Sequence, residues 1–311
     1  MGVTFGPPKS QKIMRVFVTG ASGFIGTAVV KELIDAGHQV LGLARSDSSA
    51  NALIAAGAEA HRGDLEDTHS LRSGAAVADG VIHLGFIHDF TRFKEVCEVD
   101  KQAIEAIAEV LNGSDRPLLV TSGTAIVSPG GGLATEMIIP PFNPAWPRAS
   151  EVAADAAAAR GVKASSVRLA PSVHGDGDLH GFIPILINTA RQKGVSVYVG
   201  EGLNRWNAVH RLDAARLYRL ALEKGEGGVR YHGVGEQEVT FRSIAEAIGK
   251  KLNIPVVSKS PEEAAEHFSW FAGFAGVDCP ASSELTQQWL NWHPTHSTLL
   301  EDLAGNVYFN S

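Results

Sequence analysis

The sequence VTGASGFIG, residues 18–26, joins a β-rich run to a stretch whose apolar residues have helical spacing. Its three glycines each meet a separate steric demand: a tight turn, the close approach of a phosphate, and close packing of the helix on the strand. Amide groups at the start of the helix would then bind a pyrophosphate. The stretch predicts a dinucleotide-binding loop, with contacts expected from Gly20, Ser22, Gly23, Phe24, Ile25 and Gly26.

Strand and helix patterns alternate on both sides of this loop, from residue 13 to about residue 170. Strands are predicted at 13–20, 38–45, 58–65, 78–86, 116–127 and 162–170, and helices at 24–37, 48–57, 93–113 and 148–161. Such alternation requires right-handed crossovers, so we expect an α/β fold with a doubly wound parallel sheet of the Rossmann type.

The chain divides into three parts by the same patterns. We expect a loose N-terminal arm over residues 1–12, a dinucleotide-binding domain over 13–170, and a smaller C-terminal substrate-binding lobe over 171–311. Within the lobe, a strand and helix at about 205–225 are expected to pack back on the first domain. Ligands of such folds bind at the carboxyl ends of the strands, so the lobe should cover that edge.

Composition excludes several classes of function. The formal net charge is -7, and no run of five basic residues occurs, which argues against a nucleic-acid partner. No apolar run reaches the roughly 18 residues of a membrane span, and the first residues lack a signal-peptide core, so we expect a cytoplasmic protein. Histidines and cysteines nowhere show metal-ligand spacing, and no metal site is predicted.

The residues after the second predicted strand distinguish NADP from NAD. A carboxylate about 20 residues beyond the glycine loop would hold the ribose 2′-hydroxyl of NAD. In this chain Arg45 and Ser46 occupy that place, and Asp47 follows later. Because a guanidinium matches the geometry of a 2′-phosphate, we predict NADP(H) as the cofactor, with NAD(H) less favoured.

The loop TGASGFIG (19–26) resembles the TGxxGxxG loop of the extended short-chain dehydrogenase/reductases, a group that includes sugar-nucleotide epimerases and dehydratases. GDL at 63–65, VIHLG at 81–85, RLAPSVHGDGD at 168–178 and WNAVHRLDAAR at 206–216 resemble further family segments in the same order. The resemblance covers residues 13 to about 250. It implies adenine contacts from Asp64 and Leu65, and contacts to the nicotinamide half from Leu84, Gly85, Pro171 and Val173.

The family's catalytic pair is missing from this chain. In the family, a tyrosine donates the proton and a lysine four residues later holds the nicotinamide ribose. In PRASEVAAD (147–155), these two positions hold Pro147 and Glu151, and no Tyr-x-x-x-Lys occurs elsewhere. The chain therefore resembles the atypical members of the family, which keep the glycine loop and lack the pair. We expect Glu151 to be a solvated carboxylate near the start of its helix.

Other polar residues must then supply the chemistry. We predict catalytic roles for Ser122, Thr124, Arg148 and His174, and a substrate pocket that includes His88, Trp206 and His210. The two hydroxyls follow the fifth strand, the arginine follows the lost tyrosine, and a histidine is able to transfer a proton near neutral pH. Trp206 and His210 lie where the extended family builds its substrate pocket.

The resulting prediction is an NADP(H)-dependent oxidoreductase, a carbonyl or imine reductase acting on a small hydrophobic or natural-product-like molecule. Two alternatives remain open. One is an NADP(H)-binding sensor or scaffold without turnover, and the other is isomerisation of the epimerase/dehydratase type. The resemblance also implies a homodimer formed through the helices at 93–112 and 148–160.

Overall fold

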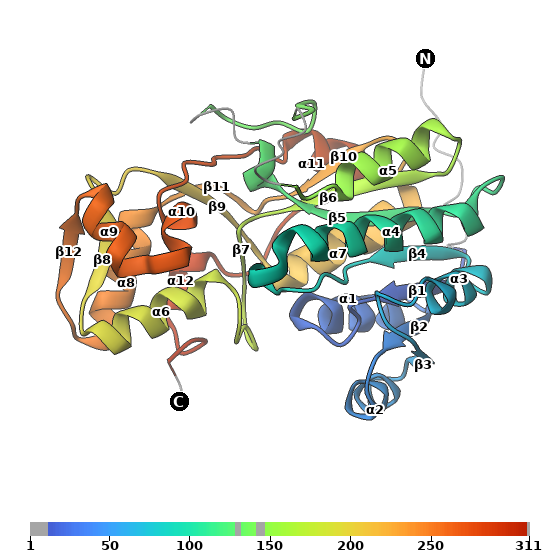
Figure 1. Cartoon of the computed structure of the whole chain (residues 1–311), viewed down its shortest axis with the longest axis horizontal. Coiled ribbons are helices and arrows are strands. Elements are labelled where there is room, and N and C mark those ends of the chain that lie inside the picture. Colours follow the sequence, from blue (N-terminus) through green and yellow to red (C-terminus); the bar gives the residue numbers. More distant parts are fainter. Residues whose placement is uncertain (1–11, 128–131, 141–146, 310–311) are drawn as a thin grey trace, which may run out of the picture.

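A seven-stranded parallel sheet forms the centre of the computed structural model, which describes residues 12–127, 132–140 and 147–309 (Figure 1). The strand order is β10-β6-β5-β4-β1-β2-β3. The strands are β1 (Arg15–Thr19), β2 (Gln39–Ala44), β3 (Glu59–Arg62), β4 (Gly80–His83), β5 (Leu118–Gly123), β6 (Ala164–Leu169) and β10 (Arg230–Gly233). The predicted doubly wound α/β fold is confirmed.

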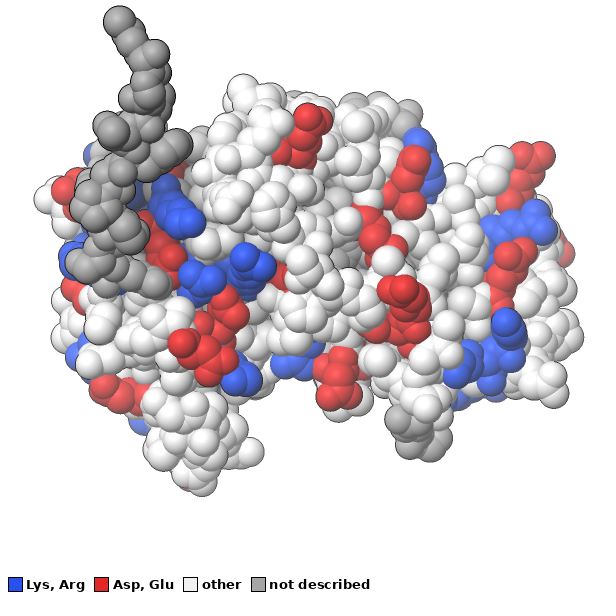
Figure 2. Space-filling view, turned by 180° about the vertical axis from the view of Figure 1, so that it is seen from behind, with Lys and Arg blue, Asp and Glu red and all other residues white. Residues whose placement is uncertain are grey.

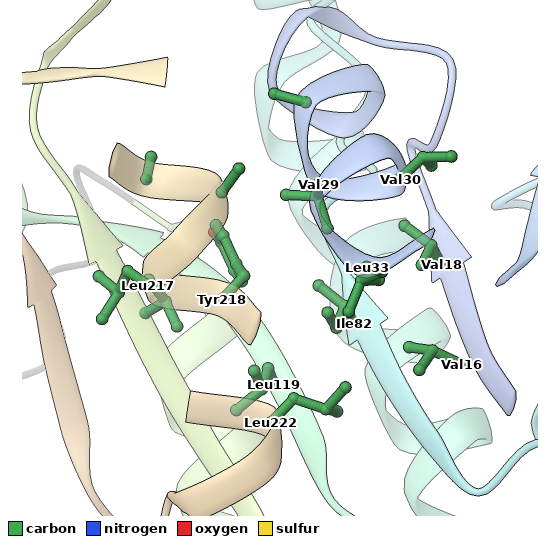
Figure 3. Close-up of a cluster of buried hydrophobic side chains, with 14 of the residues drawn as sticks. Val16, Val18, Val29, Val30, Leu33, Ile82, Leu119, Leu217, Tyr218 and Leu222 are labelled. Atoms are coloured by element: carbon green, nitrogen blue, oxygen red, sulfur yellow. The ribbon is translucent and has the colours of Figure 1, made fainter. Parts of the chain in front are cut away.

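Helices cover both faces of this sheet, and its central strands β1 and β4 are accordingly buried on both faces. One face carries α1 (Phe24–Asp35), α2 (Asp47–Ala55) and α7 (Arg211–Lys224), and the other α3 (Thr68–Ala76), α4 (Phe93–Leu111) and α5 (Ser150–Ala159). Successive side chains of β1 point to opposite faces, so Val16 and Val18 pack towards α1 whereas Phe17 packs towards α3 and α4. Figure 3 shows the first of these layers, with α1 and α7 side by side.

The second lobe has a core of its own, which contains a group of packed aromatic rings. It contains two small sheets, ordered β11-β9-β7 and β12-β8. Its strands are β7 (Ser172–His174), β8 (Ser196–Val199), β9 (Arg205–His210), β11 (Glu236–Thr240) and β12 (Val256–Lys259). Its helices are α6 (Phe182–Lys193), α8 (Phe241–Leu252), α9 (Pro261–Phe268), α10 (Ala272–Ala275) and α12 (Leu299–Ala304). Helix α11 (Glu284–Leu290) packs instead on α7 and β10 of the first domain, and its Leu290 joins that domain's core (Figure 1).

The chain passes between the first domain and the second lobe at different residues from those expected from the sequence. The helix expected near 205–225, α7, packs on α1 of the first domain, but the strand before it, β9, pairs with β7 and β11 in the second lobe. The edge strand of the large sheet is instead β10, beyond the expected segment. Its sequence RYHG lacks the alternation that marks a strand. The segment becomes a strand through its parallel pairing with β6.

Two further elements differ from the sequence patterns. Helix α3 was not predicted, since its sequence THSLRSGAA is largely polar, yet the Asp67 carboxylate caps its start by accepting from the His69 and Ser70 amides. The aromatic segment 261–276 is not one helix. It breaks at Ser269, whose φ of 53 lies in the left-handed region.

The surface is mixed in charge where Figure 2 shows it, with acidic and basic side chains interspersed over both parts of the molecule. Among the helices of the described residues, none combines the length and the apolar character needed to cross a bilayer.

Candidate functional site

The glycine loop lies where β1 meets α1, against the end of β4. Gly20 has a φ of +65, and a Cβ on it would lie 2.8 Å from the Gly85 nitrogen. A Cβ on Gly26 would lie 2.0 Å from the Gly20 carbonyl oxygen, so helix and strand meet without room for a side chain. No side chain caps the start of α1. Its first amides therefore remain available to an anion, and the loop fits a dinucleotide pyrophosphate.

The residues expected at the adenosine end lie together beside this loop. A Cβ on Gly85 would lie 2.9 Å from Leu65 Cδ2, which places that leucine against the end of β4. Arg45 extends into solvent with 79% of its side chain exposed, and its Nε lies 3.8 Å from Asp64 Oδ2. The Ser46 hydroxyl is already used, since it accepts the Ser49 amide at 3.1 Å and caps α2. Arg45 is therefore the side chain able to move towards a 2′-phosphate.

Gly85→Ala is expected to weaken NADPH binding about three- to tenfold and to lower the free energy of unfolding by roughly 1–2 kcal/mol. The added methyl would displace the Leu65 side chain from the adenosine end. Fluorescence titration with NADPH and urea unfolding measure the two effects. Gly273→Ala is the matched control, because its methyl would meet no atom within 4 Å. Equal NADPH affinity in the two variants would remove Leu65 and Gly85 from the cofactor contacts.

Arg148 lies at the carboxyl ends of β4 and β5. Its guanidinium carbon is 4.5 Å from the centroid of the Phe86 ring, just beyond β4. Its Nη2 donates to the Thr121 carbonyl oxygen in β5 at 3.5 Å, and its Nε donates to Ser150 Oγ at 3.1 Å. A charged fork of donors is thus held at the edge of the sheet where α/β proteins bind their ligands.

A buried chain of hydrogen bonds holds Ser150, the residue whose hydroxyl accepts from Arg148. Ser150 Oγ donates to Asp100 Oδ2 at 2.6 Å, and the other oxygen of that carboxylate accepts from His83 Nε2 at 3.1 Å. His83 Nδ1 in turn lies 2.9 Å from the Thr19 hydroxyl. Because the carboxylate only accepts, Ser150 has a lone pair left for Arg148. This chain of hydrogen bonds therefore fixes the direction in which the guanidinium points.

The two hydroxyls at the end of β5 differ in their surroundings. The Ser122 hydroxyl is buried and has no hydrogen-bond partner among the described residues. Thr124 is also buried, but its hydroxyl donates to Asn207 Oδ1 of β9 at 2.9 Å. Thr124 thus ties the sheet to the second lobe, which does not support its expected catalytic role. The Ser122 hydroxyl keeps an unused donor at the end of β5.

His88 follows β4 and shares this region. Its ring centroid lies 5.3 Å from that of Phe86, in an edge-on contact. Desolvation of the ring and, second, the charge of Arg148 lower the pKa of His88, and a backbone hydrogen bond with Phe86 opposes the shift. A lowered pKa favours the neutral imidazole, in which one ring nitrogen donates a hydrogen bond and the other accepts one.

Three predicted site residues lie away from this region. Trp206 is 1% exposed and packs 5.1 Å from the Phe241 ring, so it belongs to the core of the second lobe rather than to a pocket wall. His174 is buried, with Nδ1 2.6 Å from Asp302 Oδ2 of α12. Its other nitrogen, Nε2, is buried without a hydrogen-bond partner among the described residues and lies 3.8 Å from Glu236 Oε2. Both residues face inward because strands β7 and β9 pack under the C-terminal helices.

His210 caps α7 instead of lining an open pocket. Its Nδ1 accepts the Leu212 amide at 3.2 Å, and its ring stacks on His296 at 4.8 Å. Burial, followed by the charge of His174, lowers the pKa of His210 to about 4. Pro171 and Val173, in contrast, are half-buried residues next to the end of β6, in keeping with the implied nicotinamide contacts.

Glu151 corrects the expectation of a solvated carboxylate. It is 5% exposed, and both of its oxygens accept from Arg168 of β6, at 2.7 Å each. Arg168 itself is 0% exposed and also lies 3.2 Å from His232 Nε2. The sequence signal for this pair was an arginine within the otherwise small and apolar strand ASSVRL. The position of the family's lysine is thus used for a buried ion pair.

A doubly wound sheet with this glycine loop and an added C-terminal lobe defines a dinucleotide-binding protein of the extended short-chain dehydrogenase/reductase type. The sequence model of the NAD dependent epimerase/dehydratase family matches residues 16–234, and the chain belongs to that family. The resemblance read from the sequence motifs is confirmed.

Individual relatives span nearly the whole chain. It is 53% identical over 296 residues to the uncharacterized protein C2A9.02 of Schizosaccharomyces pombe, covering 95% of this chain and 100% of that protein. A 4-hydroxy-2-methyl-3-oxo-4-farnesyl-3,4-dihydroquinoline-1-oxide ketoreductase of Stigmatella aurantiaca is 26% identical, with 82% and 79% covered. Among solved structures, the dTDP-glucose 4,6-dehydratase DesIV of Streptomyces venezuelae, with NAD and TYD bound, has a TM-score of 0.74 at 20% identity and covers 94% of this chain and 95% of its own.

Proposed function

We propose that this protein is an NADP(H)-dependent oxidoreductase that reduces a carbonyl or imine group on a small hydrophobic substrate. One observation carries the proposal. The Arg148 guanidinium is held at the carboxyl ends of β4 and β5, next to the positions of the missing tyrosine and lysine, by Phe86, Thr121 and Ser150. The ketoreductase activity named for the Stigmatella aurantiaca relative supports the same class of reaction.

The residues divide the work as follows. A bound nicotinamide supplies the hydride, as it does for all enzymes of this cofactor class. Arg148 donates hydrogen bonds to the substrate oxygen and stabilises the negative charge that develops there. Because a guanidinium stays protonated, it does not act as the acid. The unpartnered Ser122 hydroxyl provides a second donor, and water provides the proton.

The alternative of epimerase- or dehydratase-type isomerisation requires a general base. Glu151, at the position of the family's lysine, is a carboxylate by type suited to that role, but its bidentate pair with the buried Arg168 keeps it away from any substrate. The reductase proposal is favoured on this ground.

The proposal is tested by measuring NADPH binding and NADPH oxidation on the same preparation. We expect fluorescence titration to show binding, and a panel of aldehydes, ketones, imines and enones to include at least one oxidant. Tight binding with no oxidation across the panel would contradict the reductase and favour a sensor or scaffold.

NADP(H) preference is proposed to rest on Arg45. Arg45→Ala is expected to raise the Kd for NADPH about 10- to 100-fold, since a charge-assisted contact contributes about 1.5–3 kcal/mol, and to leave the Kd for NADH nearly unchanged. Isothermal titration calorimetry measures both. Arg62→Ala is the matched control, because Arg62 is a half-exposed arginine at the end of the neighbouring strand β3 that pairs with Asp47. Equal affinities of the unaltered protein for NADPH and NADH would overturn the assignment.

The homodimer through α4 and α5 also stays a proposal. The two helices lie side by side on one face of the sheet (Figure 1). Much of the exposed surface of α4 is charged, with Glu98, Lys101, Glu105 and Glu109 on it. Light scattering after size-exclusion chromatography measures the oligomeric state directly.

A further inference from the structure

Arg211, the first residue of α7, connects the glycine loop to the second lobe. Its guanidinium carbon lies 4.8 Å from the centroid of the Phe24 ring, and its Nη2 donates to Thr27 Oγ1 at 3.1 Å. Both of these residues belong to the first turns of α1. On its other side, Nη1 donates to the carbonyl oxygen of Asp176, in the loop that opens the second lobe. Arg211 thus contacts α1 of the first domain, although it follows directly after β9 of the second lobe.

The backbone of that loop makes room for the arginine. Gly177 has a φ of +83, and a Cβ on it would lie 3.0 Å from Arg211 Nη1. Gly175 has a φ of +130, and its Cβ would lie 3.1 Å from Arg211 Cγ. These two glycines with positive φ therefore leave free the space that the Arg211 side chain occupies, beside the His210 ring.

The charge of Arg211 is incompletely compensated. Its guanidinium contacts a carbonyl, a hydroxyl and an aromatic face, and among the described residues no carboxylate lies within ion-pair distance of it. Its Nε is buried and has no hydrogen-bond partner among the same residues. Burial lowers the pKa of Arg211, although the carboxylates of Asp176 and Asp178 act in the opposite direction. A desolvated cation with an unused donor favours the arrival of an anion.

We infer that Arg211 binds the pyrophosphate of the dinucleotide, as a cationic contact brought to the glycine loop from outside the first βα unit. Phe24, whose ring lies under the guanidinium, is the first residue of α1 and contributes one of the free amides of the loop. The guanidinium adds positive charge at the same end of the helix as those amides and the helix dipole. The inference takes the identity of the dinucleotide, NADP(H), from the proposed function. It does not depend on the proposed reaction.

The consequence is a coupling between the two parts of the molecule. The Arg211 side chain contacts α1 of the first domain and Asp176 of the second lobe. An anion held by this side chain and by the α1 amides would draw the Gly175–Gly177 segment towards the glycine loop. Dinucleotide binding should therefore reduce the mobility of residues 175–178, which lie next to the expected nicotinamide contacts.

The test compares Arg211→Gln with Arg211→Lys and with Arg216→Gln, a control on the same helix. Two probes are titrated by calorimetry: NADPH, and adenosine 2′-monophosphate, which has the adenosine and 2′-phosphate but no pyrophosphate. We expect Arg211→Gln to raise the Kd for NADPH about tenfold, to leave the Kd for adenosine 2′-monophosphate within about twofold, and to reduce the salt dependence of NADPH binding. Arg211→Lys should retain part of the affinity, and Arg216→Gln all of it.

Hydrogen exchange gives a second readout that does not depend on turnover. NADPH should protect residues 175–178 in the unaltered protein and in Arg216→Gln, but not in Arg211→Gln. Unchanged NADPH affinity in Arg211→Gln, or an equal loss for both probes, would overturn the inference. If NADPH binds as expected and no substrate is reduced, the reductase proposal fails while the role of Arg211 stands.

Discussion

Arg148→Ala is expected to lower kcat/KM for NADPH-dependent reduction by about 10²–10³-fold, equivalent to about 2.7–4 kcal/mol of lost transition-state stabilisation. The side chain provides the charged donors that the structure brings to the ends of β4 and β5. No tyrosine or lysine of the family's pair is present to replace them. Steady-state kinetics with the best substrate from the panel, followed by NADPH absorbance, measure the loss.

Two further variants complete the test. One separates the role of the planar guanidinium donors from that of the charge, and the other is a control. Arg148→Lys keeps the charge but loses the planar pair of donors, and we expect a loss of roughly tenfold. Arg160→Ala changes an exposed arginine at the end of α5 and should leave kinetics unaltered. NADPH affinity, measured separately, should change little in all three. Full turnover in Arg148→Ala would remove this residue from the active site.

Glu151→Ala is expected to lower the free energy of unfolding by about 3–5 kcal/mol. The substitution leaves Arg168 charged, 0% exposed and without its bidentate partner, and a buried cation without a counter-charge is strongly destabilising. Arg230, whose Nε is 3.7 Å from the same carboxylate, does not compensate, because it is itself a cation. Urea unfolding followed by circular dichroism measures the change.

The double variant Glu151→Met with Arg168→Met is the control for this ion pair. Removing both charges leaves no buried ion, so most of the lost stability should return. If Glu151→Ala were as stable as the unaltered protein, the carboxylate would be solvated, as its position in the sequence first indicated. Activity in the double variant would also show that Glu151 takes no part in catalysis.

Local patterns predicted most of the fold because they arise from short-range physics. Apolar residues at strand or helix spacing located six of the seven strands of the large sheet, and the glycine loop required the turn that the structure contains. The edge strand β10 was missed, since four residues without alternation become a strand only through pairing with β6. Helix α3 was missed because its stability comes from packing under α4 rather than from its composition.

The candidate site was less predictable, because a side chain's role depends on partners far along the chain. Thr124 and His174 each had a plausible chemical role by type and place, and Glu151 was expected to be solvated. Their partners, Asn207, Asp302 and Arg168, lie between 17 and 128 residues away in the sequence. The sequence around Thr124 and His174 gives no sign of these partners, and the sign for Glu151 was a single arginine in the distant strand ASSVRL.

The sequence alone established the dinucleotide loop, the alternating α/β framework and the loss of Tyr-x-x-x-Lys. Each of these features is read from the spacing of residues that are close in the sequence. Folding in three dimensions selected among the remaining polar groups. It buried Glu151 and Trp206, engaged His174 with α12, and left Arg148 at the edge of the sheet. The physical reason is that burial and hydrogen bonding are satisfied between distant segments, and only the donors and acceptors that these contacts leave unused remain for a ligand.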